Sequence, residues 1–257
     1  VRTDQDNGLL LSGPVPSCDL AQFRVDMELA LNQLGFPPCP GNIMIRNPVW
    51  SQTLDDFKQQ LSRWIYSPEH LSAMYLGVFF DAVAVAGEAQ LVDAAKAHLR
   101  ELMLGESALL ARFAKAIDTF EDASAGVLTS IMASVGVGSD AVHIKKSGTF
   151  PIVHGVRVMA IEAGTAAVST AHRLDDLAAK SVIGEELAGD LKSALSYFME
   201  VRLRSQLAAM RTGKPEEEAI VRLSELTSRE RDLLREALKV VKRFKEILRS
   251  RYHLILL

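Results

Sequence analysis

The sequence has few cysteines, and this scarcity excludes two classes of protein. Only Cys18 and Cys39 occur among its 257 residues. Two thiols cannot form the disulfide framework of a small secreted protein, and they are too few for a cysteine-rich zinc site. We therefore expect both to be free thiols in a reducing cytoplasm.

The sequence also lacks a large excess of charge and a long apolar run. The formal net charge is −3, so no basic field favours nucleic acid or a membrane surface as a partner. The most apolar stretch, MYLGVFFDAVAVAG, contains Asp81 and is too short to cross a bilayer. No signal peptide is present, and Val1 in place of Met indicates a piece of a longer protein. These features predict a cytoplasmic protein whose upstream part is missing.

The first hundred residues have the pattern of a mixed α/β unit. GLLLSG favours a short strand, and apolar residues recur at helical spacing from Asp19 to Leu34. Prolines and glycines exclude a helix over residues 35–41, and Thr53 is expected to cap the helix that follows. The run VFFDAVAV favours a buried strand.

After Gly87 the pattern is helical almost throughout, which predicts an antiparallel helical bundle in the second half. Thr227 and Glu230 have the spacing of a capping box and are expected to open the last helix. We place the boundary between the two parts near Gly105. The other expected helices cover residues 88–104, 107–121 and 185–210, with one more that begins near Pro151 and ends at Gly164.

Asp4 and Asp6 stand just before the first expected strand. Residues i and i+2 of an extended chain point to the same side, so two carboxylates there repel unless a cation lies between them. Mg²⁺ fits this arrangement, because it binds hard oxygen ligands and commonly takes one or two carboxylates. The competing interpretation is a solvated turn, in which Asp and Asn are common.

Asp81 is the third candidate carboxylate, because it lies inside the apolar run VFFDAVAV. A charge in a core strand is costly unless it is paired or bound to a metal. A third carboxylate on a second strand would suit a two-metal phosphoryl-transfer site, in which the ions lie about 3.5–4 Å apart. The alternative is a strand-end residue whose carboxylate reaches water.

Several segments together resemble one known family. RTDQDN, GFPPCPGNIMIRNPVW and FFD, followed by HIKKSGTFPIVHGVRVMAIEAG, STAHRL, RLRSQL and LTSRERDLLREALKVVKRF, resemble bacterial nucleotidyltransferases related to PII uridylyltransferase and glutamine synthetase adenylyltransferase. In that family the catalytic part commonly follows cyclic-nucleotide-binding or CBS-pair sensor domains. The resemblance covers almost the whole chain.

This resemblance implies an α+β fold in two domains. Residues 1–104 would be a nucleotidyltransferase domain that lacks its N-terminal part, and residues 105–257 would be a helical substrate-binding domain. Asp4, Asp6 and Asp81 would bind a two-ion Mg²⁺ or Mn²⁺ site, and Asp81 would act as general base. The implied reaction transfers a nucleoside monophosphate from an NTP to a hydroxyl of a protein or small molecule and releases pyrophosphate.

The chain departs from the family pattern in ways that bear on activity. The glycine-containing segment that cradles the triphosphate comes before the Asp pair, and this chain begins after it. Val83 stands where the family often has Arg, and His154 stands where it often has Asp. These departures leave open a second hypothesis, a non-catalytic nucleotide- or protein-binding regulatory module. A third hypothesis makes the helical half a docking surface for sensor domains upstream.

The helical half supplies the candidate phosphate ligands. Lys145 and Lys146 precede an expected glycine loop, where they could meet phosphate oxygens or simply be solvated. Arg202 and Gln206 share a helix face that could contact a phosphate or only water. Arg204 could do the same, although Glu200 and Arg204 also form a favourable i,i+4 ion pair.

Overall fold

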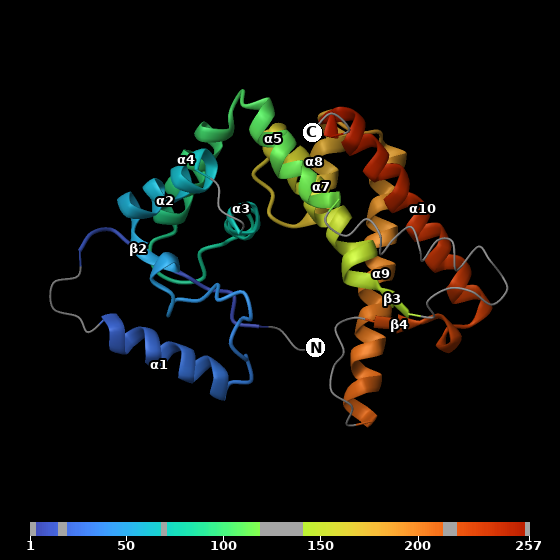
Figure 1. Cartoon of the computed structure of the whole chain (residues 1–257), viewed down its shortest axis with the longest axis horizontal. Coiled ribbons are helices and arrows are strands. Elements are labelled where there is room, and N and C mark those ends of the chain that lie inside the picture. The colour runs from blue at the N-terminus through green and yellow to red at the C-terminus, as the bar shows by residue number, and fades with distance from the viewer. Residues whose placement is uncertain (1–3, 15–19, 68–70, 119–140, 213–219, 255–257) are drawn as a thin grey trace. The chain divides into compact units, whose positions relative to one another are not determined.

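The computed structural model describes residues 4–14, 20–67, 71–118, 141–212 and 220–254, and all structural statements below concern these residues (Figure 1). The chain divides into two compact units, residues 1–104 and 105–257. The first combines helices with a small parallel sheet, and the second is mainly helical. The fold is therefore α+β.

The first unit is built around two short parallel strands. Strand β1 pairs with β2 so that Leu9 lies opposite Ser51 and Leu11 lies opposite Thr53. Upstream of β1, Gln5 forms an isolated parallel bridge with Pro38. The elements are β1 (Leu9–Leu11), α1 (Leu20–Gln33), the 3₁₀ turn η1 (Pro48–Trp50), β2 (Ser51–Thr53), α2 (Leu54–Tyr66), α3 (Ser72–Phe80) and α4 (Ala89–Met103).

The core of the first unit is an aromatic cluster on α2 and α3. As expected, Thr53 caps α2, since its Oγ1 accepts a hydrogen bond from the Asp56 amide at 3.2 Å. The amphipathic face of α2 then places its rings inward. Ring centroids lie 4.8–6.2 Å apart, in the tilted and edge-on arrangements that aromatic pairs prefer, among Trp50, Phe57, Trp64, Tyr75 and Phe79.

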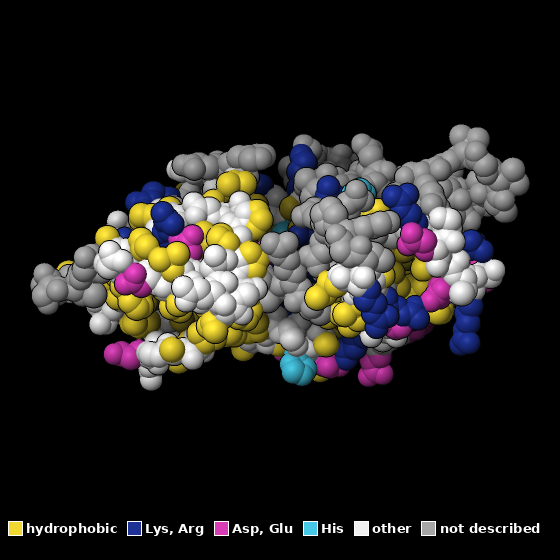
Figure 2. All heavy atoms as spheres, turned by 90° about the horizontal axis from the view of Figure 1, so that it is seen from below, with side chains coloured by type: hydrophobic (Ala, Val, Ile, Leu, Met, Phe, Trp, Pro, Cys, Tyr) yellow, Lys and Arg dark blue, Asp and Glu magenta, His cyan; other side chains and the backbone are white. Residues whose placement is uncertain are grey.

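The expected helix near residues 19–34 is present as α1, but it buries none of its residues. Phe23, Met27 and Leu34 recur on its apolar face and remain exposed. Apolar side chains are uncovered in the same way on the face that Figure 2 shows. The helix is instead held by polar contacts, which include the Arg24 guanidinium donating to Ser51 Oγ at 2.9 Å.

The strand predicted from VFFDAVAV is wrong. Val78, Phe79 and Phe80 form the last turn of α3, and the residues after Asp81 are irregular and exposed. Phe79 and Phe80 are buried on α3, which packs against α2, whereas Val83 and Val85 after Asp81 are exposed. A short apolar run has no period that separates a strand from a buried helix.

The second unit is a helical bundle with a small antiparallel ribbon that the sequence analysis did not predict. Strand β3 pairs with β4, with Val142 opposite Val221. The capping box at the start of the last helix is confirmed. The elements are α5 (Ser107–Ala114), the 3₁₀ turn η2 (Lys115–Asp118), β3 (Ala141–His143), the π-helix η3 (Lys145–Thr149), α7 (Phe150–Glu162), α8 (Thr170–Ala179), α9 (Glu185–Thr212), β4 (Ile220–Arg222), the 3₁₀ turn η4 (Leu223–Glu225) and α10 (Ser228–Arg251).

Glycine allows the close packing of η3 and α7 on their neighbours. A Cβ on Gly148 would lie 2.9 Å from the ring of Phe198 on α9. A Cβ on Gly155 would lie 2.4 Å from Leu248 and 2.7 Å from Phe244, both on α10. These separations are below van der Waals contact, so the helices approach only because no side chain intervenes.

A polar cluster joins the end of α7 to the end of α10. Arg251 Nε and Tyr252 Oη donate to the same Oε2 of Glu162, at 2.8 and 2.6 Å. Burial alone would raise the pKa of Glu162, but the hydrogen bonds from Arg251 and Tyr252 outweigh it and lower the pKa. Burial, followed by the contact with the Glu162 carboxylate, raises the pKa of Tyr252 far above its usual value.

Gly155→Ala should destabilise the second unit by about 1–3 kcal/mol, because the new methyl group overfills the contact with α10. Gly189→Ala, on α9 with open space around the new Cβ, is the matched control and should stabilise by up to about 1 kcal/mol through helix propensity. Urea unfolding of both variants measures the difference. Equal effects of the two changes would contradict the close approach of α7 to α10.

The raised pKa of Tyr252 predicts a loss of stability in alkali. Below the ordinary tyrosine pKa, near 10, the phenol is neutral in both states and its contribution is complete. Above that pH the unfolded chain releases the proton first, so stability falls as pH rises toward the folded pKa. Tyr252→Phe should flatten this decline. Thermal melts from pH 8 to 11 test it, and an unchanged slope would count against the buried phenol.

Candidate functional site

Asp4 and Asp6 project from an extended segment that leads into β1. Both residues are exposed, whereas Gln5 between them is only 3 % exposed. The Asp6 amide also donates to the Asp4 carbonyl at 3.1 Å, which draws the two residues together around Gln5. The chain therefore presents two carboxylates to solvent on the side opposite the buried glutamine.

The loop of residues 36–45 lies along this segment. The amide of Gln5 donates to the carbonyl of Pro37, and the amide of Asn7 donates to the carbonyl of Ile43, each at 3.0 Å. The loop that the prolines and glycines predicted thus forms one wall beside the Asp pair. Its irregular backbone follows from its composition, because proline removes amide donors and fixes φ.

Cys39 on this loop contacts the Asp6 carboxylate. Burial raises the pKa of the Cys39 thiol, and the hydrogen bond to Asp6 raises it further, since a thiolate beside a carboxylate is disfavoured. The thiol therefore stays protonated and can donate to Asp6. The sequence did not predict this contact, because Cys39 lies far from Asp6 along the chain.

Asp81 ends α3, at the helix C-cap position, and is half-buried. The described residues contain no group of three or more His, Cys, Asp or Glu placed to hold a metal ion. Asp4, Asp6 and Asp81 therefore do not form one three-ligand cluster in this conformation. The segment after Asp81 is unusually apolar for a surface, since Val83 is 59 % and Val85 is 92 % exposed.

The expected glycine loop at Lys145 and Lys146 is instead the π-helix η3. Ser147 and Gly148 are buried within it, and Gly148 packs on Phe198. Helical hydrogen bonds satisfy the backbone groups here, which a buried irregular loop would leave without partners. Lys145 is exposed and Lys146 is half-buried. A π-helical turn inside α-helical structure is often a functional feature.

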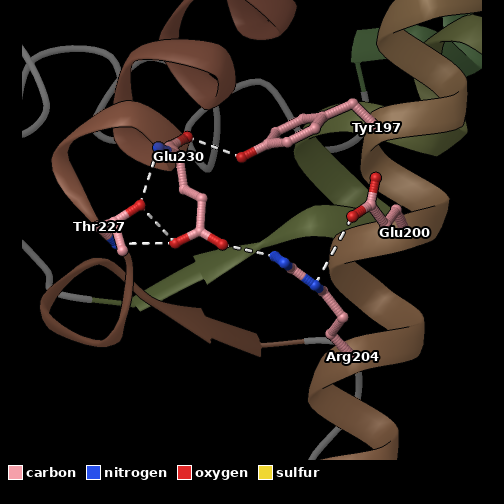
Figure 3. Close-up of polar contacts among 5 residues, drawn as sticks. All are labelled: Tyr197, Glu200, Arg204, Thr227 and Glu230. Atoms are coloured by element: carbon pink, nitrogen blue, oxygen red, sulfur yellow. Dashed lines mark hydrogen bonds and ion pairs between the residues drawn. The ribbon is translucent and has the colours of Figure 1, made fainter.

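Arg204 is held in a network between α9 and α10. Figure 3 shows its guanidinium between Glu200, at 3.6 Å, and Glu230. The expected i,i+4 pair with Glu200 is therefore confirmed. Hydrogen bonds from the Thr227 amide and hydroxyl lower the pKa of Glu230, and Arg204 adds to this. Arg204 thus has a structural role in this conformation.

Tyr197 completes the same network. Its hydroxyl donates to the carbonyl of Glu230 at 2.7 Å, so the first turn of α10 is bound to α9 through side chain and backbone together. Burial raises the pKa of Tyr197, and the neighbouring Glu230 carboxylate raises it further. The network fixes the position of the capping box rather than presenting charge to a ligand.

Arg202 and Gln206 are less engaged in ion pairs and hydrogen bonds than Arg204. Both are half-buried on α9. The Nε of Arg202 is buried and has no hydrogen-bond partner among the described residues. A buried guanidinium nitrogen without a partner is costly, so this group is a better candidate than Arg204 for binding an anion.

His154, which stands where the resembled family often has Asp, is a core residue. It is 3 % exposed, its Nε2 donates to the carbonyl of Phe113 at 2.7 Å, and its ring stacks on Phe150. Because a carbonyl only accepts, Nε2 carries the hydrogen and Nδ1 can accept from Arg157 at 3.4 Å. The side chain of His154 is therefore part of the packed core.

An open hollow of about 480 Å³ lies at the carboxyl ends of β1 and β2, where Leu11 and Thr53 end the strands. The Asp pair precedes β1 and is therefore at the opposite end of that strand. Polar side chains that line the hollow already have partners, since Thr53 Oγ1 donates to Asp56 at 2.7 Å and Gln60 Oε1 accepts from Arg63 at 2.7 Å. The hollow is separate from the carboxylate site.

The two units match two regions of one nucleotidyltransferase class. Residues 1–70 match the family described as putative nucleotidyltransferase DUF294. Residues 107–252 match the family described as putative nucleotidyltransferase substrate binding domain, and the chain belongs to this family. A comparison with curated proteins gave no match.

The helices of the described residues include no candidate for a membrane span. Not one of them is both long enough and apolar enough to cross a membrane. This agrees with the interruption of the most apolar stretch by Asp81.

Asp6→Asn should increase the reactivity of Cys39 several-fold, because removing the carboxylate lowers the thiol pKa and raises the thiolate fraction. Iodoacetamide labelling at pH 8 measures the rate. Cys18 lies outside the described residues and is replaced by Ser in every variant, so that only Cys39 reports. Asp4→Asn is the control. If both substitutions accelerate labelling equally, the contact between Asp6 and Cys39 is not the cause.

Proposed function

We propose that this protein is a metal-dependent nucleotidyltransferase that transfers a nucleoside monophosphate from an NTP to a hydroxyl of a protein or small molecule. The observation that carries the proposal is the exposed pair Asp4 and Asp6 on one side of an extended segment, in a region that matches a nucleotidyltransferase family. Two hard carboxylate ligands with open space before them fit Mg²⁺ or Mn²⁺. The transferred group is a uridylyl or adenylyl group.

Asp4 and Asp6 would hold the divalent cation, which supplies charge stabilisation at the phosphate oxygens. In the reaction the acceptor oxygen forms a bond to the α-phosphorus, and the bond from that phosphorus to the bridging oxygen breaks as pyrophosphate leaves. The hydroxyl proton passes to Asp81, the proposed general base and third carboxylate.

This role for Asp81 requires the segment that follows α3 to move. Val83 and Val85 alternate with alanines and are exposed, so residues 82–86 are an uncovered apolar segment. A rearrangement of that segment within the first unit would have to bring Asp81 from the end of α3 to the Asp pair. In the second unit, Lys145, Lys146, Arg202 and Gln206 would bind substrate phosphates or the acceptor.

A second candidate function is a nucleotide- or protein-binding regulatory module without turnover. The buried position of His154 and the separate position of Asp81 favour it. Upstream sensor domains would then act through binding alone. The two functions differ in one product, because only the enzyme releases pyrophosphate.

The double change Asp4→Asn with Asp6→Asn should reduce pyrophosphate release by more than about 100-fold, since loss of metal ligands exceeds the 10–100-fold cost of losing an outer partner. The measurement uses the full natural protein with Mg²⁺, a panel of NTPs and a coupled pyrophosphate assay. Asp55→Asn, at an exposed residue on α2, is the control for loss of a surface carboxylate and should retain activity.

Three outcomes separate the hypotheses. Release that depends on the Asp pair supports the enzyme. NTP binding in calorimetry with no release from any NTP supports the regulatory module. Release that is unchanged in the double variant rejects the metal assignment.

A further inference from the structure

The segment that carries the Asp pair is anchored at every second residue. Gln5 Nε2 donates to the carbonyl of Phe36 at 2.7 Å and to the carbonyl of Glu28, on α1, at 3.1 Å. Asn7 Oδ1 accepts from the amide of Ile45 at 2.8 Å. Asp6 lies between these anchors and Asp4 directly precedes them, so both aspartates face the other way.

Gln5 is the more demanding anchor because it is buried. Its amide nitrogen has two hydrogens, and each has its own carbonyl acceptor. A one-residue slip of the segment would turn Gln5 to solvent and bring a carboxylate inside, leaving the carbonyls of Glu28 and Phe36 without this donor. A buried unsatisfied group costs about 1–3 kcal/mol, and a buried charge costs more. The side chain of Gln5 therefore selects one register.

The same contact joins the Asp pair to two other parts of the unit. Glu28 lies on α1 and Phe36 begins the loop that continues to Ile45. An ion pair of 2.8 Å between Arg46 and Glu28 joins the far end of the loop to the same residue of α1. The loop and the helix are thus joined both through Gln5 and through this ion pair.

We propose that Gln5 is a positioning residue for the metal-binding carboxylates. Its amide fixes the register and orientation of Asp4 and Asp6 by binding α1 and the loop of residues 36–45, and it does not touch the cation itself. This inference rests on the proposed function, because it assumes that the Asp pair binds a divalent cation. The role matches that of outer partners in metal sites, which orient the ligands that do bind.

The test is Gln5→Met, which keeps the length and volume of the side chain but removes both donors. The chain is titrated with Mn²⁺, and the free ion is followed by electron paramagnetic resonance, a readout that needs no substrate and no turnover. We expect the Mn²⁺ dissociation constant to rise about 10–100-fold. The matched control is Gln52→Met, which removes the hydrogen bond from Gln52 Nε2 to the carbonyl of Val49, 2.7 Å long, in the same unit.

Stability and metal affinity separate a positioning role from a structural one. Both variants should lower the midpoint of thermal unfolding, but only Gln5→Met should weaken Mn²⁺ binding. If Gln5→Met does not fold, Gln5→Asn keeps an amide that is one methylene too short to reach both carbonyls, and it should give a smaller loss of affinity. Wild-type affinity in a folded Gln5 variant, or an equal loss in Gln52→Met, overturns the proposal.

The wild-type chain and the double variant Asp4→Asn with Asp6→Asn distinguish this failure from failure of the proposed function. If both bind Mn²⁺ equally, the metal assignment is wrong and the positioning role falls with it. If wild type binds more tightly than the double variant and Gln5→Met matches wild type, only the positioning role is wrong.

Discussion

The hydrogen bonds from the buried amide of Gln5 to two main-chain carbonyls are the contact on which the carboxylate site depends. They decide which residues of a polar segment face the protein and which face solvent. Main-chain hydrogen bonds and the Asn7 side chain also hold the segment, but Gln5 is the side chain whose burial would be lost in a slipped register. The position of the carboxylates thus depends on polar burial of the residue between them, with the Cys39 thiol as a further contact of Asp6.

In the helical unit some arginines hold helices together, whereas another is not engaged in such a contact within the described part of the chain. Arg204 and Arg251 are engaged in contacts that hold α9 to α10 and α7 to the end of α10. Arg202, two residues before Arg204 on the same helix, has a buried Nε with no hydrogen-bond partner among the described residues. Neighbouring arginines on one helix therefore differ in what they can offer a ligand. The difference follows from which side of α9 faces the first turn of α10.

Local signals predicted much of the fold. Thr53 and the pair Thr227 and Glu230 marked helix starts correctly, because capping depends on side chains within one turn of the helix. The sequence did not predict the β3–β4 ribbon, whose strands have three residues each and pair across about eighty positions of chain. It singled out Asp4 and Asp6, which the structure shows exposed, but not Gln5, since a buried glutamine between two aspartates looks like part of a polar turn. Gln5 is buried by α1 and the loop, which follow it along the chain, so the local sequence pattern does not show its burial.

Two exposed valines follow α3, and covering their side chains would contribute hydrophobic free energy. Val83 and Val85 are 59 % and 92 % exposed, and burying a valine side chain is worth about 1.5–3 kcal/mol, so covering both could contribute about 3 kcal/mol. That amount corresponds to a shift of about 100-fold in a two-state equilibrium. A partner or substrate that covers the segment next to Asp81 would gain this free energy, less the entropic cost of ordering the residues that make the contact.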